Sequence, residues 1–411
     1  MTLASPTPSG PESSSGPAWR RPEILLLVMA AAMPLAMSTW QVLFTNFAIE
    51  RAGLDGAAIG IIQSVREIPG FLAFSFVALL FLFREQTIAI LALLVLGVGV
   101  ILTGLFPGHV GLLTTTLIMS VGFHYFETAQ QSLTLQWTAR ARTPLMLGRI
   151  LSTGSFASLG AFGMVWLLLT FLDLGYVVVY AVGGGLTVVL AIFAWAAFPR
   201  FPAGVEQKKR LLLRKRYWLY YLLVFMSGAR RQIFVVFSVL LLVEKFGLPV
   251  EDVTLLFLLN YAINTVAAPW IGRFVARFGE RRSLTFEYCG LIGVFIGYAF
   301  VDSIWLAGAL YVLDHLLFSM ALALKTYFQK IADPADISPT AGVAFTISHI
   351  AAIVIPAAFG LLWLVDPTLV FVAGAAMASC SLVMARFVPA DPRQGYETIL
   401  ARPAVAASPA E

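Results

Sequence analysis

Charged and histidine side chains recur inside long apolar stretches of this sequence, where their presence needs a physical reason. An ionised group taken from water into apolar surroundings is costly unless it is paired, coordinates an ion or performs a function. The sequence has five such clusters: Arg66–Glu67, His124 with Glu127, Arg230–Arg231, Asp314–His315 and His349.

Three of these residues are arginines, and a guanidinium group fits a carboxylate or phosphate through two parallel hydrogen bonds. Arg66, Arg230 and Arg231 are therefore candidate contacts for an anionic ligand. Neighbouring residues on a helix project about 100° apart, so Arg230 and Arg231 can hardly both face one narrow cavity. We expect one to line the cavity and the other to pair with an acid on an adjacent helix; the sequence leaves open which does which.

The acids and most of the histidines are candidate proton carriers, because carboxyl and imidazole groups exchange protons near neutral pH when their surroundings tune them. His124 and Glu127 are three residues apart and so share one helical face. The candidates are Glu67, Glu127, Asp314, His124 and His315.

The same residues also have a structural interpretation, in which ion pairs hold neighbouring helices together. Three arginines are matched by Glu67, Glu127 and Asp314, so their charges sum to zero when the histidines are neutral. The convergence of several clusters at one depth favours a functional site. His349 lies nearer the end of its apolar segment, where a structural hydrogen bond to a neighbouring hydroxyl explains a histidine better than a functional role does.

The composition identifies what these clusters are embedded in. Of 411 residues, 59% are hydrophobic and 12% are charged, whereas globular chains have about 45–50% and 25%. Unbroken runs such as LALLVLGVGVILTGLF indicate membrane helices, because a membrane β-strand alternates polar and apolar residues. We therefore predict an all-α polytopic membrane protein whose partner is the lipid bilayer.

Twelve apolar segments of membrane-spanning length follow one another along the chain. The longest polar stretch between them, with seven Lys and Arg residues, divides the segments into six plus six. The segments are roughly 23–49, 57–83, 87–106, 109–137, 150–173, 176–198, 217–243, 251–275, 283–301, 303–331, 341–364 and 367–389.

The domain organisation follows from these segments. The N-terminal residues 1–19 are rich in Pro, Ser and Gly, and the C-terminal residues 390–411 have a similar composition, so both are predicted to be disordered tails. Between them we predict a six-helix bundle at 20–198, a basic linker at 199–216 and a second six-helix bundle at 217–389.

The distribution of positive charge predicts the orientation. With the N-terminus in the cytoplasm, all but six of the 27 Lys and Arg residues lie in cytoplasmic loops and tails, as the positive-inside rule requires. The six exceptions are Arg51 and Lys245 on the outer side and Arg66, Arg230, Arg231 and Lys325 inside segments. We expect an inner-membrane protein with both termini cytoplasmic, and no binding to nucleic acid.

An internal repeat relates the two sets of six segments. ERAGL at 50–54 resembles EKFGL at 244–248, and AFGMVW at 161–166 resembles AFGLLW at 358–363. The offsets, 194 and 197 residues, are nearly equal and place each match at the same point of its half. The sequence therefore predicts a parallel duplication about an axis along the membrane normal.

A short motif adds to this pattern. The loop sequence GRFVARFGERR at 272–282 is similar to the signature G-x-x-x-D-R-x-G-R-R of the major facilitator superfamily of secondary transporters. Ala276 stands at the Asp position, and the corresponding loop in the first half is reduced to LFREQT with Arg84. The matching residues are Gly272, Arg277, Gly279, Arg281 and Arg282.

The resemblance implies a cavity lined by segments 1, 4, 7 and 10, three of which carry the clusters above, and a cytoplasmic gate held by the motif. Segment 1 adds Trp40 and Gln41 as candidate substrate contacts. We expect a monomeric, proton-coupled secondary transporter of a small anionic or zwitterionic solute, working by alternating access. The alternatives are efflux of amphipathic compounds, and a membrane sensor or scaffold that transports nothing.

Other chemistry has no support in the sequence. There is no P-loop, G-x-S-x-G or H-E-x-x-H motif, so we expect no enzyme activity and no cofactor. Cys289 and Cys380 lie in apolar runs and are expected to be buried small hydrophobes. Met33 and Met37 are spaced like a thioether pair, but methionine is common filler in apolar helices, and we expect no metal site.

Overall fold

The computed structural model describes residues 17–138, 143–202, 213–333 and 336–401. Within these ranges the regular structure is helical, apart from one isolated β-bridge between Arg393 and Tyr396. The first α-helices are α1 (Pro22–Glu50), α2 (Gly56–Phe71), α3 (Phe76–Leu79), α4 (Glu85–Leu105), α5 (His109–Trp137), α6 (Thr143–Thr170) and α7 (Tyr176–Ala197). The others are α8 (Trp218–Phe246), α9 (Val250–Phe278), α10 (Glu280–Ala299), α11 (Ile304–Phe318), α12 (Leu322–Ile331), α13 (Ile337–Val365) and α14 (Pro367–Ala385).

Local sequence explains where several helices begin and end. Asp55 caps α2 by accepting a hydrogen bond from the Ala58 amide at 2.8 Å. Gly279 separates α9 from α10 with φ +78°, a backbone conformation that residues other than glycine rarely adopt. Two predicted segments are each divided by a 3₁₀ turn, at η2 (Leu72–Ser75) after α2 and at η4 (Ser319–Ala321) after α11.

The apolar character of the helices agrees with a multi-pass membrane protein. Among the described residues, nine helical stretches are long and apolar enough to cross a membrane. The helices α2, α5 and α10 fall outside this set. These are also the helices that carry Arg66–Glu67, His124 with Glu127, and Glu280 with Arg281 and Arg282. With 16 residues, α2 is also shorter than a membrane span, because a 3₁₀ turn divides its predicted segment.

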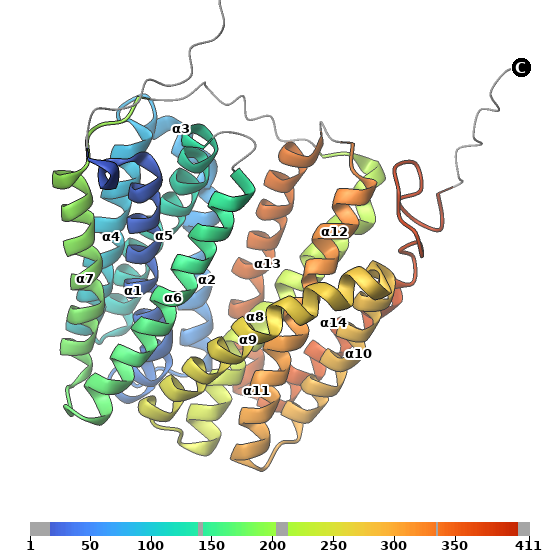
Figure 1. Ribbon diagram of the computed structural model, residues 1–411. Helices are drawn as coiled ribbons and strands as arrows, with labels where there is room; N and C mark the ends of the chain where they lie inside the picture. The colour runs from blue at the N-terminus through green and yellow to red at the C-terminus, as the bar shows by residue number, and fades with distance from the viewer. Residues whose placement is uncertain (1–16, 139–142, 203–212, 334–335, 402–411) are drawn as a thin grey trace, which may run out of the picture.

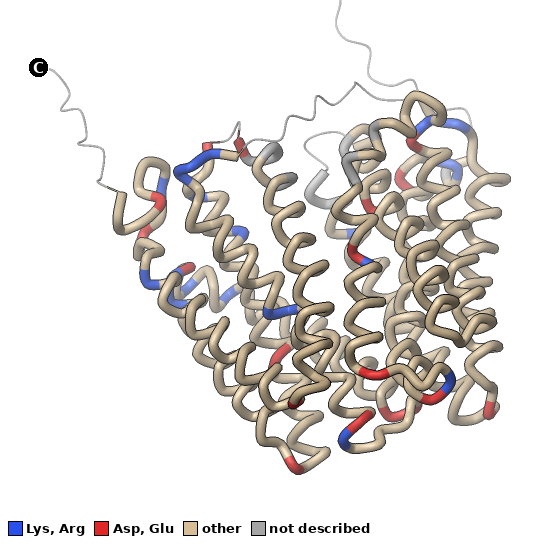
Figure 2. The backbone as a smooth tube through the Cα atoms, turned by 180° about the vertical axis from the view of Figure 1, so that it is seen from behind, with Lys and Arg blue, Asp and Glu red and all other residues tan. Residues whose placement is uncertain are grey.

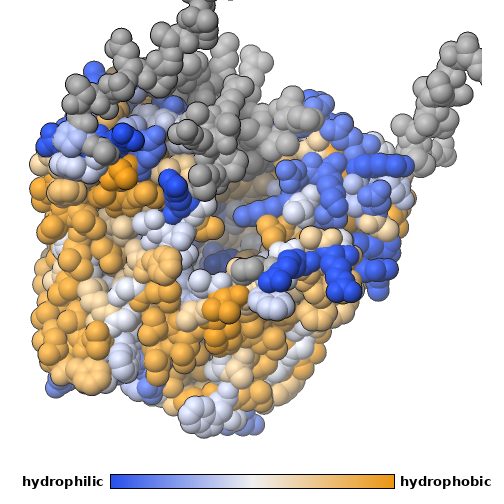
Figure 3. Space-filling model, in the orientation of Figure 1, coloured by the Kyte–Doolittle hydropathy of each residue, from blue (hydrophilic) through white to orange (hydrophobic). Residues whose placement is uncertain are grey.

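The helices form two groups that lie side by side in Figure 1, an N-terminal group of α1–α7 and a C-terminal group of α8–α14. They spread apart toward the end where α1, α8 and α13 begin, which we call the basic end. Figure 2 shows that charged residues gather near the two ends of the helices, with few along the middle. Figure 3 shows a broad apolar surface between these ends.

The two groups touch chiefly where α2 packs on α13 and where α6 packs on α9. A Cβ atom added at Gly60 would lie 2.2 Å from the Pro356 carbonyl oxygen, so this close approach requires glycine. The Ala357 amide, next to the helix-breaking Pro356, donates a hydrogen bond to the Ser64 hydroxyl across the contact at 2.9 Å. A backbone group loosened by the proline is therefore satisfied by the opposite group.

The C-terminal segment differs in part from its prediction as a disordered tail. Residues 390–401 fold back on the C-terminal group, where the Tyr327 hydroxyl donates to the Glu397 carbonyl at 2.6 Å. The Gln394 amide donates to the Ala332 carbonyl at 2.7 Å. These side chain–backbone bonds order a segment whose composition suggested none. Residues 1–16, 203–212 and 402–411, which hold most of the other predicted tail and the linker, lie outside the described residues.

The prediction that both cysteines are buried is wrong, because Cys289 and Cys380 are both exposed. In a membrane protein the outer surface of the helices faces lipid, so an apolar side chain gains little by turning inward. An apolar run therefore does not identify the buried face of its helix.

Candidate functional site

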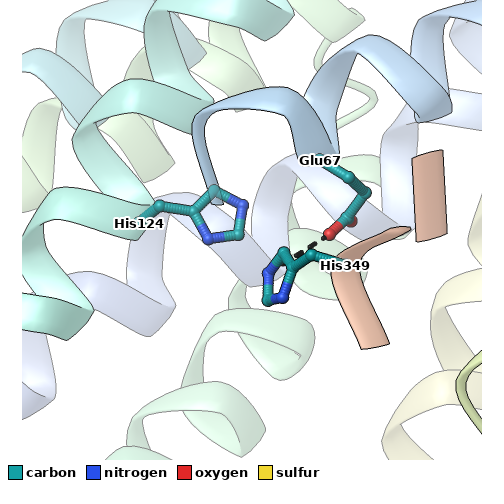
Figure 4. Close-up of side chains that lie close together, drawn as sticks. All are labelled: Glu67, His124 and His349. Atoms are coloured by element: carbon teal, nitrogen blue, oxygen red, sulfur yellow. Dashed lines mark ion pairs between the residues drawn. The ribbon is translucent and has the colours of Figure 1, made fainter. Parts of the chain in front are cut away.

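Four polar residues meet where the two groups of helices touch, and we call them the interface cluster: Arg66, Glu67, His124 and His349. Arg66 and Glu67 lie on α2, His124 on α5 and His349 on α13. All four are buried, with at most 8% of each residue exposed. Figure 4 shows the carboxylate of Glu67 and both imidazoles gathered at one point.

Within the cluster, Arg66 binds one oxygen of its neighbour. The Nε and Nη2 atoms of Arg66 donate to Glu67 Oε1 at 2.9 and 2.6 Å. The guanidinium also lies 5.6 Å from the centre of the Trp40 ring on α1. The Ser120 hydroxyl donates to the Arg66 carbonyl. The arginine is thus neutralised and held in place within the N-terminal group.

The second carboxylate oxygen of Glu67 faces the other group of helices. Its Oε2 atom lies 3.8 Å from His349 Nε2 (Figure 4). His349 is oriented by a hydrogen bond of its Nδ1 atom to the Phe345 carbonyl at 2.9 Å. Its ring centre lies 5.2 Å from that of His124, whose Nδ1 atom is buried without a hydrogen-bond partner in the described protein. Three groups that can carry protons therefore span the contact between α2, α5 and α13.

The same three groups have the chemistry of a metal site. Ligand atoms of Glu67, His124 and His349 all lie within 4.8 Å of one another, and carboxylate oxygen and imidazole nitrogen are ligands of Zn²⁺. Arg66 argues against a resident dication, because its positive charge already occupies the same carboxylate. The charges therefore favour proton exchange over metal binding.

A second set of charges lies in the C-terminal group, and we call it the α8 cluster: Arg230, Arg231, Glu287, Asp314 and His315. Arg230 is 1% exposed and faces Glu287 on α10, with Nη2 and Oε1 3.9 Å apart. The Tyr288 ring lies 4.3 Å from the guanidinium, and Arg230 Nε donates to the Met226 carbonyl at 3.1 Å. Arg230 is therefore enclosed inside its own group of helices.

Arg231 points elsewhere, as its position on the helix requires. It is exposed, and its guanidinium lies 4.6 Å from the centre of the Phe318 ring on α11. Asp314 is buried at 6% exposure, within electrostatic range of both arginines. Its Oδ2 atom lies 4.0 Å from His315 Nδ1, which bonds to the Tyr311 carbonyl at 2.9 Å. Of the twin arginines, Arg231 is thus the accessible one.

The remaining predicted site residues lie around these clusters. Trp40 is fully buried and stacks on Phe44 with ring centres 4.5 Å apart, so it meets Arg66 but presents no surface. Gln41 and Glu127 are half-buried on α1 and α5. Glu127 interacts electrostatically with Glu67, so Glu127 lies close to the interface cluster.

The motif residues lie together at the junction of α9 and α10. Gly279 forms the turn, Arg277 lies 5.5 Å from the Phe278 ring, and Arg281 and Arg282 open α10. No neighbour lies within 4 Å of the position a Cβ would take at Gly272. Glu280, which interrupts the motif, is buried and binds Lys330 on α12 at 2.8 Å. Glu280 therefore joins α10 to α12.

A third cluster of charge lies at the basic end. Asp336, whose side chain is 2% exposed, binds Arg214 and Arg216. It also accepts a hydrogen bond from the Tyr217 hydroxyl at 3.0 Å. The hydrogen bonds from Arg214 are the main reason that the pKa of the Asp336 carboxyl lies below its usual value of 3.8. This cluster joins the residues before α8 to the beginning of α13.

Two features of the site were not foreseen from the sequence. Glu287 was missed because it lies only a few residues inside its predicted segment, where an acid suggests the membrane boundary. The presence of an acid inside the apolar segment 283–301 was the sequence feature that could have identified Glu287 as a buried charge. The position of His349 near a segment end favours a simple structural bond, but the packing of α13 on α2 brings it against Glu67.

The fold and its buried charges define a membrane protein built for transport, with long apolar helices around polar groups at the contact of two helical groups. The family model of the Major Facilitator Superfamily matches residues 25–356. The chain belongs to this superfamily and is a transporter, not an enzyme. A search of curated protein sequences finds no match.

Solved structures share the fold. The nucleoside transporter NupG has 16% identity and a TM-score of 0.71, covering 89% of this chain and 97% of its own. A bacterial homologue of the human lysosomal transporter Spinster, inward-facing and occupied, has 13% identity and a TM-score of 0.72, covering 90% and 97%. The POT family transporter PepTSo has 13% identity and a TM-score of 0.69, also covering 90% and 97%.

Proposed function

We propose that the protein is a secondary transporter with twelve membrane-spanning helices in two halves of six. The nine apolar spans are completed by α2, α5 and α10. Two of these helices place an acid against another helix instead of against lipid: Glu67 of α2 faces His349, and Glu287 of α10 faces Arg230. The short helices α3 and α12 complete the spans begun by α2 and α11. The repeat in the sequence and the two groups in Figure 1 support a duplication. The excess of positive charge at the basic end supports a cytoplasmic location for this end, and we expect the protein to lie in an inner membrane.

The substrate that fits best is a small anionic or zwitterionic solute. The main support is the different surroundings of the two adjacent arginines, since Arg230 is enclosed with Glu287 while Arg231 is exposed. An exposed guanidinium on a cavity-lining helix can bind a carboxylate or phosphate through its bidentate fork. Such an anion offsets the charge of Arg231, which otherwise favours the ionised form of the Asp314 carboxyl, so Asp314 takes up a proton more readily when the anion is bound.

Proton coupling is the second part of the proposal, and it rests on the interface cluster. Glu67 and His349 belong to opposite groups of helices, so gain or loss of a proton changes the charge across a contact that alternating access must break. The His124 ring packs against His349, and the carboxylate of half-buried Glu127 lies close enough to interact electrostatically with Glu67. A His349 protonated at Nε2 attracts the Glu67 carboxylate, so protonation of Glu67 then removes this attraction and favours separation of α2 from α13.

The experiment that tests the substrate class is binding and uptake by the purified protein. A thermal-shift screen uses amino acids, dipeptides, nucleosides and dicarboxylates. It thereby includes nucleosides and peptides, which the names of fold neighbours give as their substrates. Hits are then measured as uptake into proteoliposomes with a proton gradient.

The twin arginines supply the matched pair of variants for that screen. We expect Arg231→Lys to weaken binding of an anionic hit roughly tenfold, because lysine keeps the charge but loses one charged hydrogen bond. Arg230→Lys should leave affinity unchanged and lower the melting temperature. Unaltered affinity in both variants, or a hit list of neutral amphipathic compounds, would favour the efflux alternative.

A further inference from the structure

A pocket that the transport proposal does not use lies where α9 ends and α10 begins, beside the end of α14. It has a volume of about 690 Å³. Arg281, Arg282 and Arg386 supply its charge, while Phe278, Phe286 and Cys289 supply apolar surface. Two of the arginines belong to the loop motif, and the third comes from the end of a different helix. The pocket therefore gathers positive charge from two parts of the chain.

These arginines have no acid to neutralise them in the described part of the chain. None of the three forms an ion pair there, and the acid nearest in sequence to Arg281, Glu280, is turned away to bind Lys330. Three positive groups around one hollow repel one another, and the repulsion falls when an anion enters. The charge of the pocket thus predicts a ligand with at least one phosphate or carboxylate.

The apolar side of the pocket narrows the choice of anion. Phe278 and Phe286 are 40% and 55% exposed, so both present ring surface outward. Cys289, seven residues beyond Arg282 on α10, is also exposed and lies about 10 Å further along the helix. In Figure 3 hydrophilic surface over this end of the C-terminal group meets the apolar surface of the helices directly. The pocket is charged toward water and apolar toward the membrane interior.

We propose that this pocket binds the headgroup of an anionic phospholipid, with the phosphate held by Arg281, Arg282 and Arg386 and the acyl chains along Phe286 and Cys289. Basic pockets between membrane helices suit such headgroups. A free anion would use the arginines but gain nothing from the exposed apolar surface. The inference requires only that the chain spans a membrane, so it stands or falls independently of the proposed substrate.

The test compares lipids in nanodiscs made from phosphatidylcholine with and without phosphatidylglycerol, and counts retained lipid by native mass spectrometry. Each interfacial arginine contributes about fivefold to the binding of anionic lipid. We expect the parent protein to prefer phosphatidylglycerol by at least tenfold, and the triple variant Arg281→Ala, Arg282→Ala, Arg386→Ala to lose that preference. Arg277→Ala is the control for the single substitution Arg281→Ala, since each removes one positive charge beside the α9–α10 turn but Arg277 lies outside the pocket.

Three results would overturn the proposal. The first is an equal phosphatidylglycerol preference in the triple variant, and the second is a loss in Arg277→Ala equal to that in Arg281→Ala. The third is displacement of the lipid by inorganic phosphate at millimolar concentration, which would show a site for small anions. If the triple variant does not fold, Arg386→Ala alone, at an exposed helix end, must lower the preference severalfold. An unchanged preference in that variant also counts against the site.

Discussion

The interface cluster and the α8 cluster use the same chemistry in two mechanical settings. Each pairs an arginine with a glutamate inside the protein, Arg66 with Glu67 at 2.6 Å and Arg230 with Glu287 at 3.9 Å. The first pair meets a histidine from the opposite group of helices, whereas the second lies wholly among α8, α10 and α11. Under the proposed alternating-access mechanism, only the first pair lies on a contact that must open, so we expect the two buried pairs to have different roles.

The geometry of the two pairs follows this distinction. Both carboxylate oxygens of Glu287 and both terminal nitrogens of Arg230 are buried without a hydrogen bond in the described protein. Glu67 instead receives two hydrogen bonds from Arg66 and keeps one oxygen for His349. A loosely paired, fully enclosed ion pair adds little to stability, so the α8 pair is poorly suited to holding helices together.

The largest expected effect comes from breaking the α8 pair on one side. Glu287→Gln leaves the guanidinium of Arg230 buried and uncompensated, which should lower the free energy of unfolding by about 3–5 kcal/mol. Melting of the purified protein in detergent checks the direction and ranks the variants.

The double variant Arg230→Met, Glu287→Leu sharpens this first test. It removes both charges, fills similar volume and should melt at or above the parent temperature, while substrate affinity persists through Arg231. A double variant as unstable as Glu287→Gln would contradict the view that the pair is dispensable.

The second effect concerns transport and contrasts two histidines. His349 and His315 each bond through Nδ1 to the carbonyl four residues earlier at 2.9 Å, but only His349 lies on the contact between groups. His349→Gln should reduce proton-driven accumulation toward equal concentrations on both sides while substrate exchange continues, because exchange need not release the proton. Radiolabelled uptake into proteoliposomes, with and without a pH gradient, measures both modes.

His315→Gln is the matched control and should accumulate substrate as the parent does. If His315→Gln loses accumulation and His349→Gln keeps it, the coupling site belongs to the α8 cluster with Asp314. The contrast between a moving contact and a fixed one would then be reversed.

The third effect distinguishes the roles that we propose for Asp314 and Glu127. Asp314→Asn should weaken the dependence of substrate affinity on pH, because the carboxylate that competes for Arg231 is gone. Glu127→Gln should slow proton-driven uptake without changing affinity, since Glu127 lies by the interface cluster and has no link to Arg231. Binding measured at several pH values distinguishes the two; an affinity change in Glu127→Gln alone would place the substrate elsewhere.

The two clusters also show which parts of the fold and of the site could be predicted from the sequence. Apolar runs and the motif at 272–282 predicted the membrane fold and the family, because hydropathy and a glycine-bearing turn are local properties. The 100° rule predicted that Arg230 and Arg231 would have different surroundings, and they do. Which acid meets which arginine depends on how helices distant in sequence pack, so Glu287 and the reach of His349 required the three-dimensional arrangement.

The smallest expected effect adds a third Arg–carboxylate cluster, at the water-exposed basic end. Asp336→Asn removes the charge that binds Arg214 and Arg216, whose side chains are 47% and 39% exposed. Water screens such pairs, so the melting temperature should fall by only a small amount at neutral pH.

The effect of Asp336→Asn should also depend on pH. Because the pKa of Asp336 is lowered in the folded protein, the stability that its carboxylate contributes is fully present above the unfolded pKa and is lost as pH falls through the folded pKa. The difference between parent and variant should therefore hold from pH 7 down to about the usual value of 3.8 and shrink only below it. If the difference in melting temperature vanished between pH 5 and 7, a group other than Asp336 would cause it. If Asp336→Asn destabilised the protein as much as Glu287→Gln, the effect of removing an acid would not depend on how deeply its cluster is buried.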